Sequence, residues 1–115
     1  MDVALDPDYV KNGWVYLAYV HTDHDPKALS SPAMTRIIRG KIQDHQWVDQ
    51  EVLFQVNKEL MLGHGTRWGC RLLFDKQGDL FFTIGDVDRG EMSQDPSKPN
   101  GKVFRIHADG SIPAD

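Results

Sequence analysis

Side chains that could do chemistry gather in two segments of this chain. His64 lies between two glycines, which permit unusual backbone geometry, and Arg67 follows three residues later. Asp86 comes directly after an apolar run and opens a polar stretch, residues 86–100, whose length is typical of a functional loop. An imidazole can accept a proton near neutral pH, a carboxylate can orient it, and a guanidinium binds anions through paired hydrogen bonds. These residue types suit proton transfer or the binding of an anionic ligand.

The same residues also have purely structural explanations. His64 can be a loop histidine without a proton role, and Asp86 can be the turn aspartate that often follows a strand. Cys70 is the single cysteine, which excludes an internal disulfide framework and a multi-cysteine zinc site, and we expect it to be a small core residue. Residues 21–25 carry metal-ligand types but are predicted to form a solvated polar loop, so no metal ligand is assigned.

The elements that must position these residues are predicted to be short strands. Apolar and β-branched runs alternate with turn residues, and no segment repeats convincingly at helical spacing. A β-hairpin around the Gly-containing turn at residues 76–78 is the clearest local feature. The fold class is therefore all-β, and the three tryptophans are expected in the sheet core. Strands are predicted at residues 14–20, 35–42, 48–56, 71–75, 79–85 and 102–106.

Composition excludes several classes of function. The 115 residues suffice for one domain or less, and 40% hydrophobic with 26% charged residues is globular. A net charge of −4 without a basic stripe argues against a nucleic-acid partner. No apolar run approaches the roughly 18 residues that span a bilayer, so no membrane partner is expected. Met1 is followed at once by Asp2, without the features of a signal peptide, so none is predicted in this chain.

Three groups of motifs occur here in an order that resembles one known family. Residues 1–9 (MDVALDPDY) run into 12–17 (NGWVYL), and residues 69–75 (GCRLLFD) run into 78–86 (GDLFFTIGD). Residues 101–106 (GKVFRI) and 109–113 (DGSIP) complete the set. Together they resemble the soluble glucose/sorbosone dehydrogenases, also called aldose sugar dehydrogenases, which depend on pyrroloquinoline quinone (PQQ). Each motif is weak alone, but the ordered set covers essentially the whole chain.

The resemblance implies a fold, a reaction and a location. The family folds as a six-bladed β-propeller, of which residues 1–115 would form a segment of about two blades of antiparallel strands. It oxidises an aldose, a small-molecule sugar, at the anomeric carbon by hydride transfer to PQQ, with calcium bound. It is periplasmic or secreted. A lone segment would expose sheet edges, so we also expect self-association through them.

One position departs from the family pattern. The base of the family is a histidine four residues before the hairpin arginine, and Arg67 stands there in this chain. A guanidinium stays protonated and cannot act as a base. Either His64 replaces the missing base, or Arg67 binds an anionic ligand such as a quinone carboxylate, while Asp86 matches the carboxylate that orients the family histidine. The sequence thus predicts a dehydrogenase segment that is inactive alone or, alternatively, a non-catalytic binding or interaction module.

Overall fold

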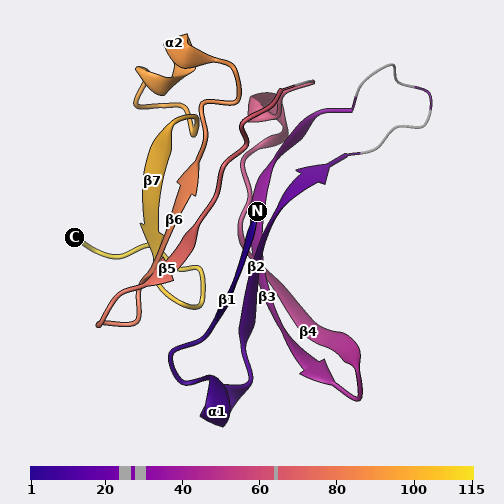
Figure 1. The fold of residues 1–115 in the computed structure, drawn as a ribbon. Helices are drawn as coiled ribbons and strands as arrows, with labels where there is room; N and C mark the ends of the chain where they lie inside the picture. Colours follow the sequence, from indigo (N-terminus) through magenta and orange to yellow (C-terminus); the bar gives the residue numbers. More distant parts are fainter. Residues whose placement is uncertain (24–26, 28–30, 64) are drawn as a thin grey trace.

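Seven strands in two antiparallel sheets make up the computed structural model, which describes residues 1–23, 27, 31–63 and 65–115 (Figure 1). In each sheet the strands lie side by side in chain order, the meander from which propeller blades are built. The first sheet contains β1 (Asp2–Leu5), β2 (Val15–Thr22), β3 (Ala33–Gln43) and β4 (Gln46–Phe54). The second contains β5 (Leu72–Phe74), β6 (Leu80–Ile84) and β7 (Lys102–Ile106).

Among the described residues, three single helical turns connect the strands. They are α1 (Tyr9–Asn12), the 3-10 turn η1 (Lys58–Leu60) and α2 (Gly90–Ser93). Within the described ranges, no helix has the length and apolar character needed to cross a membrane.

The all-β prediction and its six strands are confirmed, with corrections at three places. β2 continues to Thr22, so His21 and Thr22 pair with β3 and are not loop residues. β1 was not predicted, although Val3 pairs with Leu17 of β2. The polar stretch at residues 86–100 contains α2 and is therefore not wholly irregular.

The hydrophobic core lies between the two sheets. The rings of Phe54, Phe82 and Phe104 lie with their centroids 4.9 to 5.1 Å apart, so β4 contacts β6 and β7. Tyr16 meets Phe74 edge to face at 4.9 Å, which joins β2 to β5. Aromatic pairs at such distances stabilise beyond the area that they bury.

The tryptophans are half-buried: Trp47 lies in β4, and Trp14 and Trp68 lie in the segments that lead into β2 and β5. Trp14 and Trp68 pack against the core cluster, and the Trp47 ring covers Gly40 so closely that a Cβ there would lie 2.4 Å from it. Trp14 and Trp68 thus adjoin the core without being buried in it, so the prediction of sheet-core tryptophans holds only in part. Cys70 is likewise a buried core residue with a free thiol, and burial raises the pKa of that thiol.

A polar contact ties the sheets together away from the aromatic core. The Tyr16 hydroxyl lies 2.9 Å from Asp6 Oδ2 and 3.0 Å from the carbonyl oxygen of Ala108, in the turn after β7. Arg39 Nη1 donates to the same carbonyl at 2.9 Å and pairs with Glu51. Asp6 and Tyr16 belong to the motifs at the start of the chain, and Ala108 lies between the two motifs at its end, so this contact joins the first motifs to the turn after β7.

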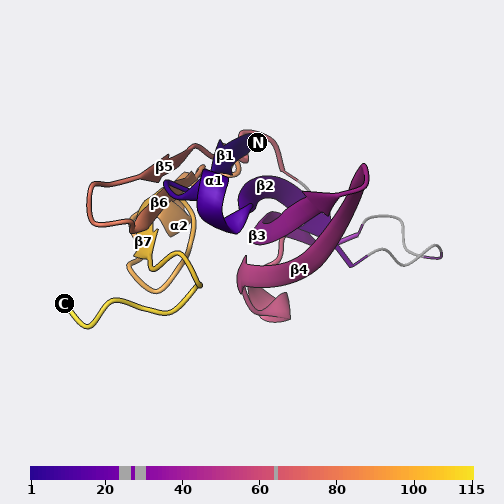
Figure 2. The ribbon, with the colours of Figure 1, turned by 90° about the horizontal axis from the view of Figure 1, so that it is seen from below.

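Several connections gather at one end of the sheets. Figure 1 shows α2, η1 and the segment that leads into β5 at the upper end, whereas α1 and the turn between β3 and β4 lie at the lower end. Seen from below in Figure 2, the sheets stand side by side with β1 next to β5. Leu72 N–H donates to Asp2 Oδ2 at 2.9 Å and so links these two strands. The upper end is where the candidate residues lie.

Candidate functional site

The segment before β5 and the loop after β6 meet at the upper end of the second sheet. Gly85 N–H donates to the carbonyl oxygen of Trp68 at 2.9 Å, and Gly101 N–H donates to the Gly85 carbonyl at 3.0 Å. A Cβ on Gly85 would lie 1.9 Å from the Arg67 carbonyl oxygen, so only glycine allows this approach. The β6 strand therefore ends against the backbone of Arg67.

The backbone at this junction is strained. Arg67 has φ 52°, and the consecutive residues Val87 and Asp88 have φ 54° and 58°. A β-branched residue in the left-handed region is a genuine outlier, and Val87 is completely buried there. Such strain costs stability and is concentrated at sites that need a fixed geometry. The junction is thus a functional-site candidate on backbone evidence alone.

Asp88 is the centre of the side-chain contacts. Its Oδ2 accepts hydrogen bonds from the Thr66 N–H at 2.9 Å and from the Thr66 hydroxyl, and its Oδ1 pairs with the Arg67 guanidinium. The Thr66 hydrogen bonds, with a smaller effect of Arg67, hold the pKa of Asp88 below its ordinary value. Asp88 is therefore the carboxylate that fixes the segment before β5.

Asp86 is the second carboxylate on Arg67. Arg67 Nε lies 3.5 Å from Asp86 Oδ1, and the same oxygen accepts the Asp88 N–H at 3.2 Å. The side chain of Arg67 is 65% exposed and those of Asp86 and Asp88 are 37% and 35% exposed, so a ligand can reach all three. We call Arg67, Asp86 and Asp88 the acidic clamp.

Asn100 stabilises the loop after β6, which contains Asp86 and Asp88. Its Nδ2 donates to the Asp86 carbonyl at 3.2 Å, and the side chain is completely buried, with no partner for its Oδ1 among the described residues. Lys102 Nζ donates to the carbonyls of Ser93 and Asn100 at 2.8 and 2.9 Å. These contacts hold Asp86 on a defined backbone, although its loop is polar.

The structure brings together two of the three predicted site residues. Arg67 and Asp86, 19 positions apart in the sequence, form an ion pair, whereas His64 lies outside the described residues. Asp88 and Thr66 were not predicted. The signal that could have found Asp88 is the Asp-Val-Asp spacing, which places a second carboxylate two residues after the first.

Of the polar residues 21–25, the structure describes the first three. His21 Nε2 lies 3.5 Å from Asp23 Oδ1, and His24 and Asp25 lie outside the described residues. Nowhere in the part of the chain that the structure describes do three or more histidine, cysteine or acidic side chains gather in a way that could hold a metal ion.

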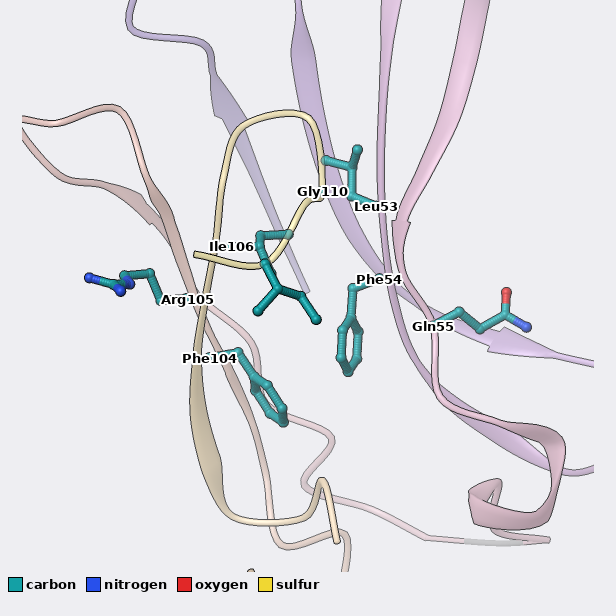
Figure 3. A pocket seen from close by; sticks show the side chains of 8 residues that line it. Leu53, Phe54, Gln55, Phe104, Arg105, Ile106 and Gly110 are labelled. Carbon is teal, nitrogen blue, oxygen red and sulfur yellow. The ribbon is translucent and has the colours of Figure 1, made fainter. Parts of the chain in front are cut away.

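A groove of about 380 Å³ lies between β4 and β7 (Figure 3). Phe54 and Phe104 face each other across it, with Leu53, Ile106 and Gly110 nearby. Arg105 is the single ionisable residue among those that line it, so the groove offers no acid–base pair. The acidic clamp, not this groove, is the candidate for chemistry.

Comparison with known proteins extends the description. Residues 1–115 match the family model described as Glucose / Sorbosone dehydrogenase. The chain is 31% identical over 117 residues to "Aldose sugar dehydrogenase YliI" of Escherichia coli (strain K12), covering all of this chain and 30% of that protein. The chain thus spans about 30% of the length of that curated relative.

Solved structures show the same fold. A "glucose dehydrogenase" with 28% sequence identity superimposes with a TM-score of 0.85, over 98% of this chain and 32% of that one. The PQQ-bound aldose sugar dehydrogenase of Streptomyces coelicolor matches at 24% identity and a TM-score of 0.71, over 94% of this chain and 30% of that one. At that identity the likeness concerns the fold alone. The prediction of a partial propeller is confirmed.

Proposed function

Because the chain belongs to the glucose/sorbosone dehydrogenase family, we propose that it is a segment of a sugar oxidoreductase and supplies part of the wall of its reaction site. The observation that carries this proposal is the acidic clamp, in which Arg67, Asp86 and Asp88 meet on strained backbone and remain accessible. A site that must hold ligands in one geometry is built from side chains fixed by their neighbours. The clamp meets that requirement.

The proposed reaction is oxidation of an aldose at its anomeric carbon. Removing hydride from that carbon requires a base that takes the hydroxyl proton. Arg67 occupies the position where the resemblance places this base, and its guanidinium cannot accept a proton. We therefore expect no turnover from this chain alone.

Arg67 also changes what Asp86 does. In the resemblance Asp86 would orient the base histidine, but here its Oδ1 lies 3.5 Å from Arg67 Nε. The carboxylate oxygens are hydrogen-bond acceptors, which suits the binding of sugar hydroxyl groups as donors. His64 as a substitute base stays a prediction.

Arg67 and Lys102 are both engaged within the chain, which argues against a cradle for PQQ at the clamp. The carboxylates of the quinone need cations that are free to pair with them, but Arg67 is neutralised by two carboxylates and Lys102 is bonded to two carbonyls. We derive no step through the quinone for this chain. PQQ, calcium and a periplasmic or secreted location remain proposals for the complete protein, in which other blades would hold the cofactor.

A non-catalytic binding segment is the second candidate. The observation that favours it is the same ion pair, because a base position filled by a bound arginine has a structural role without proton transfer. Such a segment would retain the propeller surface and the acidic clamp as a ligand contact.

A hybrid enzyme distinguishes the two candidates. Residues 1–115 replace the matching segment of the E. coli aldose sugar dehydrogenase, with Arg67 retained or changed to histidine. We expect aldose-dependent dye reduction, with PQQ and calcium supplied, from the Arg67→His hybrid and none from the hybrid that keeps Arg67. The control is Arg71→His in the hybrid that keeps Arg67. Arg71 lies four residues after Arg67 and its side chain is 86% exposed, so a histidine there should not restore turnover. If both hybrids fold and bind PQQ but neither turns over, the binding role is favoured.

A further inference from the structure

The two carboxylates of the acidic clamp are separated in sequence by one apolar residue. Val87 stands between Asp86 and Asp88, and its side chain is completely buried. A Cβ on Gly65 would lie 2.4 Å from Val87 Cγ1 and 3.2 Å from the Val87 carbonyl oxygen, so Val87 packs directly against the backbone of Gly65. Gly65 lies two residues before Arg67. Val87 therefore joins the loop of the two carboxylates to the segment that carries the guanidinium.

Val87 keeps this contact at a cost to its backbone. Its φ of 54° lies in the left-handed region, where a β-branched residue is a genuine outlier, whereas a glycine adopts this region without a steric penalty. A strained residue persists only where its surroundings over-determine it. An aliphatic side chain transfers no proton and binds no ion, so what Val87 contributes to the site is its shape.

The turn around Val87 sets the direction of both carboxylates. Asp86 Oδ1 accepts the Asp88 N–H at 3.2 Å, which closes the turn over Val87. The same Asp86 oxygen lies 3.5 Å from Arg67 Nε, and Asp88 Oδ1 pairs with the Arg67 guanidinium. A shift of Val87 would therefore move both acceptors relative to position 67.

Other contacts of the loop act before this turn. Asn100 Nδ2 donates to the carbonyl oxygen of Asp86, and the N–H of Gly85 donates to the segment before β5. These hydrogen bonds fix where the loop begins. The middle of the turn is held by the packing of Val87 on Gly65.

We propose that Val87 is a positioning residue, whose side chain, packed against Gly65, sets the distance between position 67 and the two carboxylates of the acidic clamp. Its role in a reaction rests on the proposed function, in which position 67 faces the reacting group. Side chains that hold a functional group in place act through shape, and a displacement of about 1 Å can cost about 100-fold in rate. The packing of Val87 on Gly65 lies wholly within the described chain.

The titration of an imidazole at position 67 tests this proposal without turnover. In the hybrid enzyme with Arg67→His, the imidazole Nε2 stands as many bonds from Cα as the Nε of arginine, so the two carboxylates should raise its pKa above the ordinary histidine value of about 6.5. NMR of labelled histidine, read as a difference from the hybrid that keeps Arg67, measures the midpoint. Val87→Ala should lower this midpoint by about 0.5 pH unit or more. Val15→Ala is the matched control and should leave it unchanged, since Val15 is also a buried valine (5% exposed) but begins β2 of the first sheet.

Turnover of the same hybrids is the second readout. Val87→Ala should lower kcat of the Arg67→His hybrid by about 10-fold or more and change KM by less than about 2-fold, because the carboxylates move relative to the imidazole. Gly65→Ala disturbs the same contact from the other side and should also lower the titration midpoint. It tests the proposal even where Val87→Ala does not fold, and circular dichroism establishes folding for each variant.

The outcomes separate the role of Val87 from the proposed function. An ordinary histidine midpoint with Val87 intact, a midpoint that Val87→Ala and Gly65→Ala leave unchanged, or one that Val15→Ala lowers equally would overturn the proposal. A midpoint that falls with Val87→Ala in a hybrid without turnover would support the positioning role and count against the proposed function instead.

Discussion

At the scale of single residues, Arg67 decides what the site can do. Its guanidinium contacts Asp86 and Asp88, so a position that the resemblance gives to a proton acceptor is filled by a permanent cation. The sequence identified Arg67 and Asp86 through their places in the motifs. It missed Asp88, because the Asp-Val-Asp spacing does not show which residues contact it: its partners Thr66 and Arg67 lie 22 and 21 positions away and only the fold brings them together.

Asp88 should make the stability of the chain depend on acidic pH. Its pKa is lowered in the folded state, chiefly by the Thr66 hydrogen bonds, so its contribution is complete above the unfolded value of about 3.9 and is lost as the pH falls through the folded value. Thermal unfolding between pH 6 and pH 2 should therefore show a steeper acid loss of melting temperature for wild type than for Asp88→Asn. The matched control is Asp49→Asn, since Asp49 also has a left-handed backbone (φ 54°). Equal slopes for wild type and Asp88→Asn would contradict this assignment.

At the scale of elements, the site depends on how β6 ends against the segment before β5. The sequence predicted the β5–β6 hairpin because its turn is local, with Asp75 Oδ1 accepting the N–H groups of Gln77 and Asp79. It missed β1 and α2 because each has four residues, too few to show a period, and β1 is defined by its pairing with β2. Short elements follow from tertiary contacts more than from local pattern.

Gly85→Ala should disrupt this junction. A Cβ there would lie 1.9 Å from the Arg67 carbonyl oxygen, a backbone atom that cannot move aside as a flexible side chain can. We expect a loss of about 3 kcal/mol in the free energy of unfolding, measured by denaturant titration.

Gly90→Ala is the control for that measurement. A Cβ on Gly90 meets nothing within 4 Å, so this variant should stay within about 0.5 kcal/mol of wild type. If the two substitutions cost the same free energy of unfolding, the close approach at Gly85 does not determine the stability of this junction.

At the scale of the whole molecule, two layers are held by an aromatic core and by the contact of Tyr16 with Asp6 and Ala108. The sequence predicted strands and a propeller segment, but the sheet-to-sheet contact joins residues 92 positions apart and could not be read from local pattern. This contact joins the first motifs to the turn after β7, with the acidic clamp between them in sequence and at the opposite end of the sheets.

Tyr16→Phe should weaken the association of the two sheets. It removes the hydroxyl from a buried hydrogen-bonded position, and we expect a loss of about 1 to 2 kcal/mol in the free energy of unfolding. Tyr19→Phe, which removes a half-buried hydroxyl that accepts from Arg36 at 3.3 Å, should cost about 0.5 kcal/mol or less.

Tyr16 should also set the alkaline limit of stability. Burial raises the pKa of Tyr16 to about 12, so its contribution is complete below the unfolded value of about 10 and is lost as the pH rises toward 12. The Tyr16→Phe variant lacks this group, and its stability should fall less between these pH values. A parallel fall in both proteins would show that Tyr16 does not titrate in this way.

The measurement that tests the central claim most directly is aldose-dependent dye reduction by the hybrid enzyme with Arg67→His, with and without Asp86→Asn. If the upper end of the second sheet is the reaction site, the histidine hybrid turns over, and Asp86→Asn lowers its rate by about 100-fold or more because the base loses its orienting carboxylate. Asp49→Asn, at an exposed position in β4, should leave the rate unchanged. A folded histidine hybrid without turnover, or one whose rate ignores Asp86→Asn, would contradict the account.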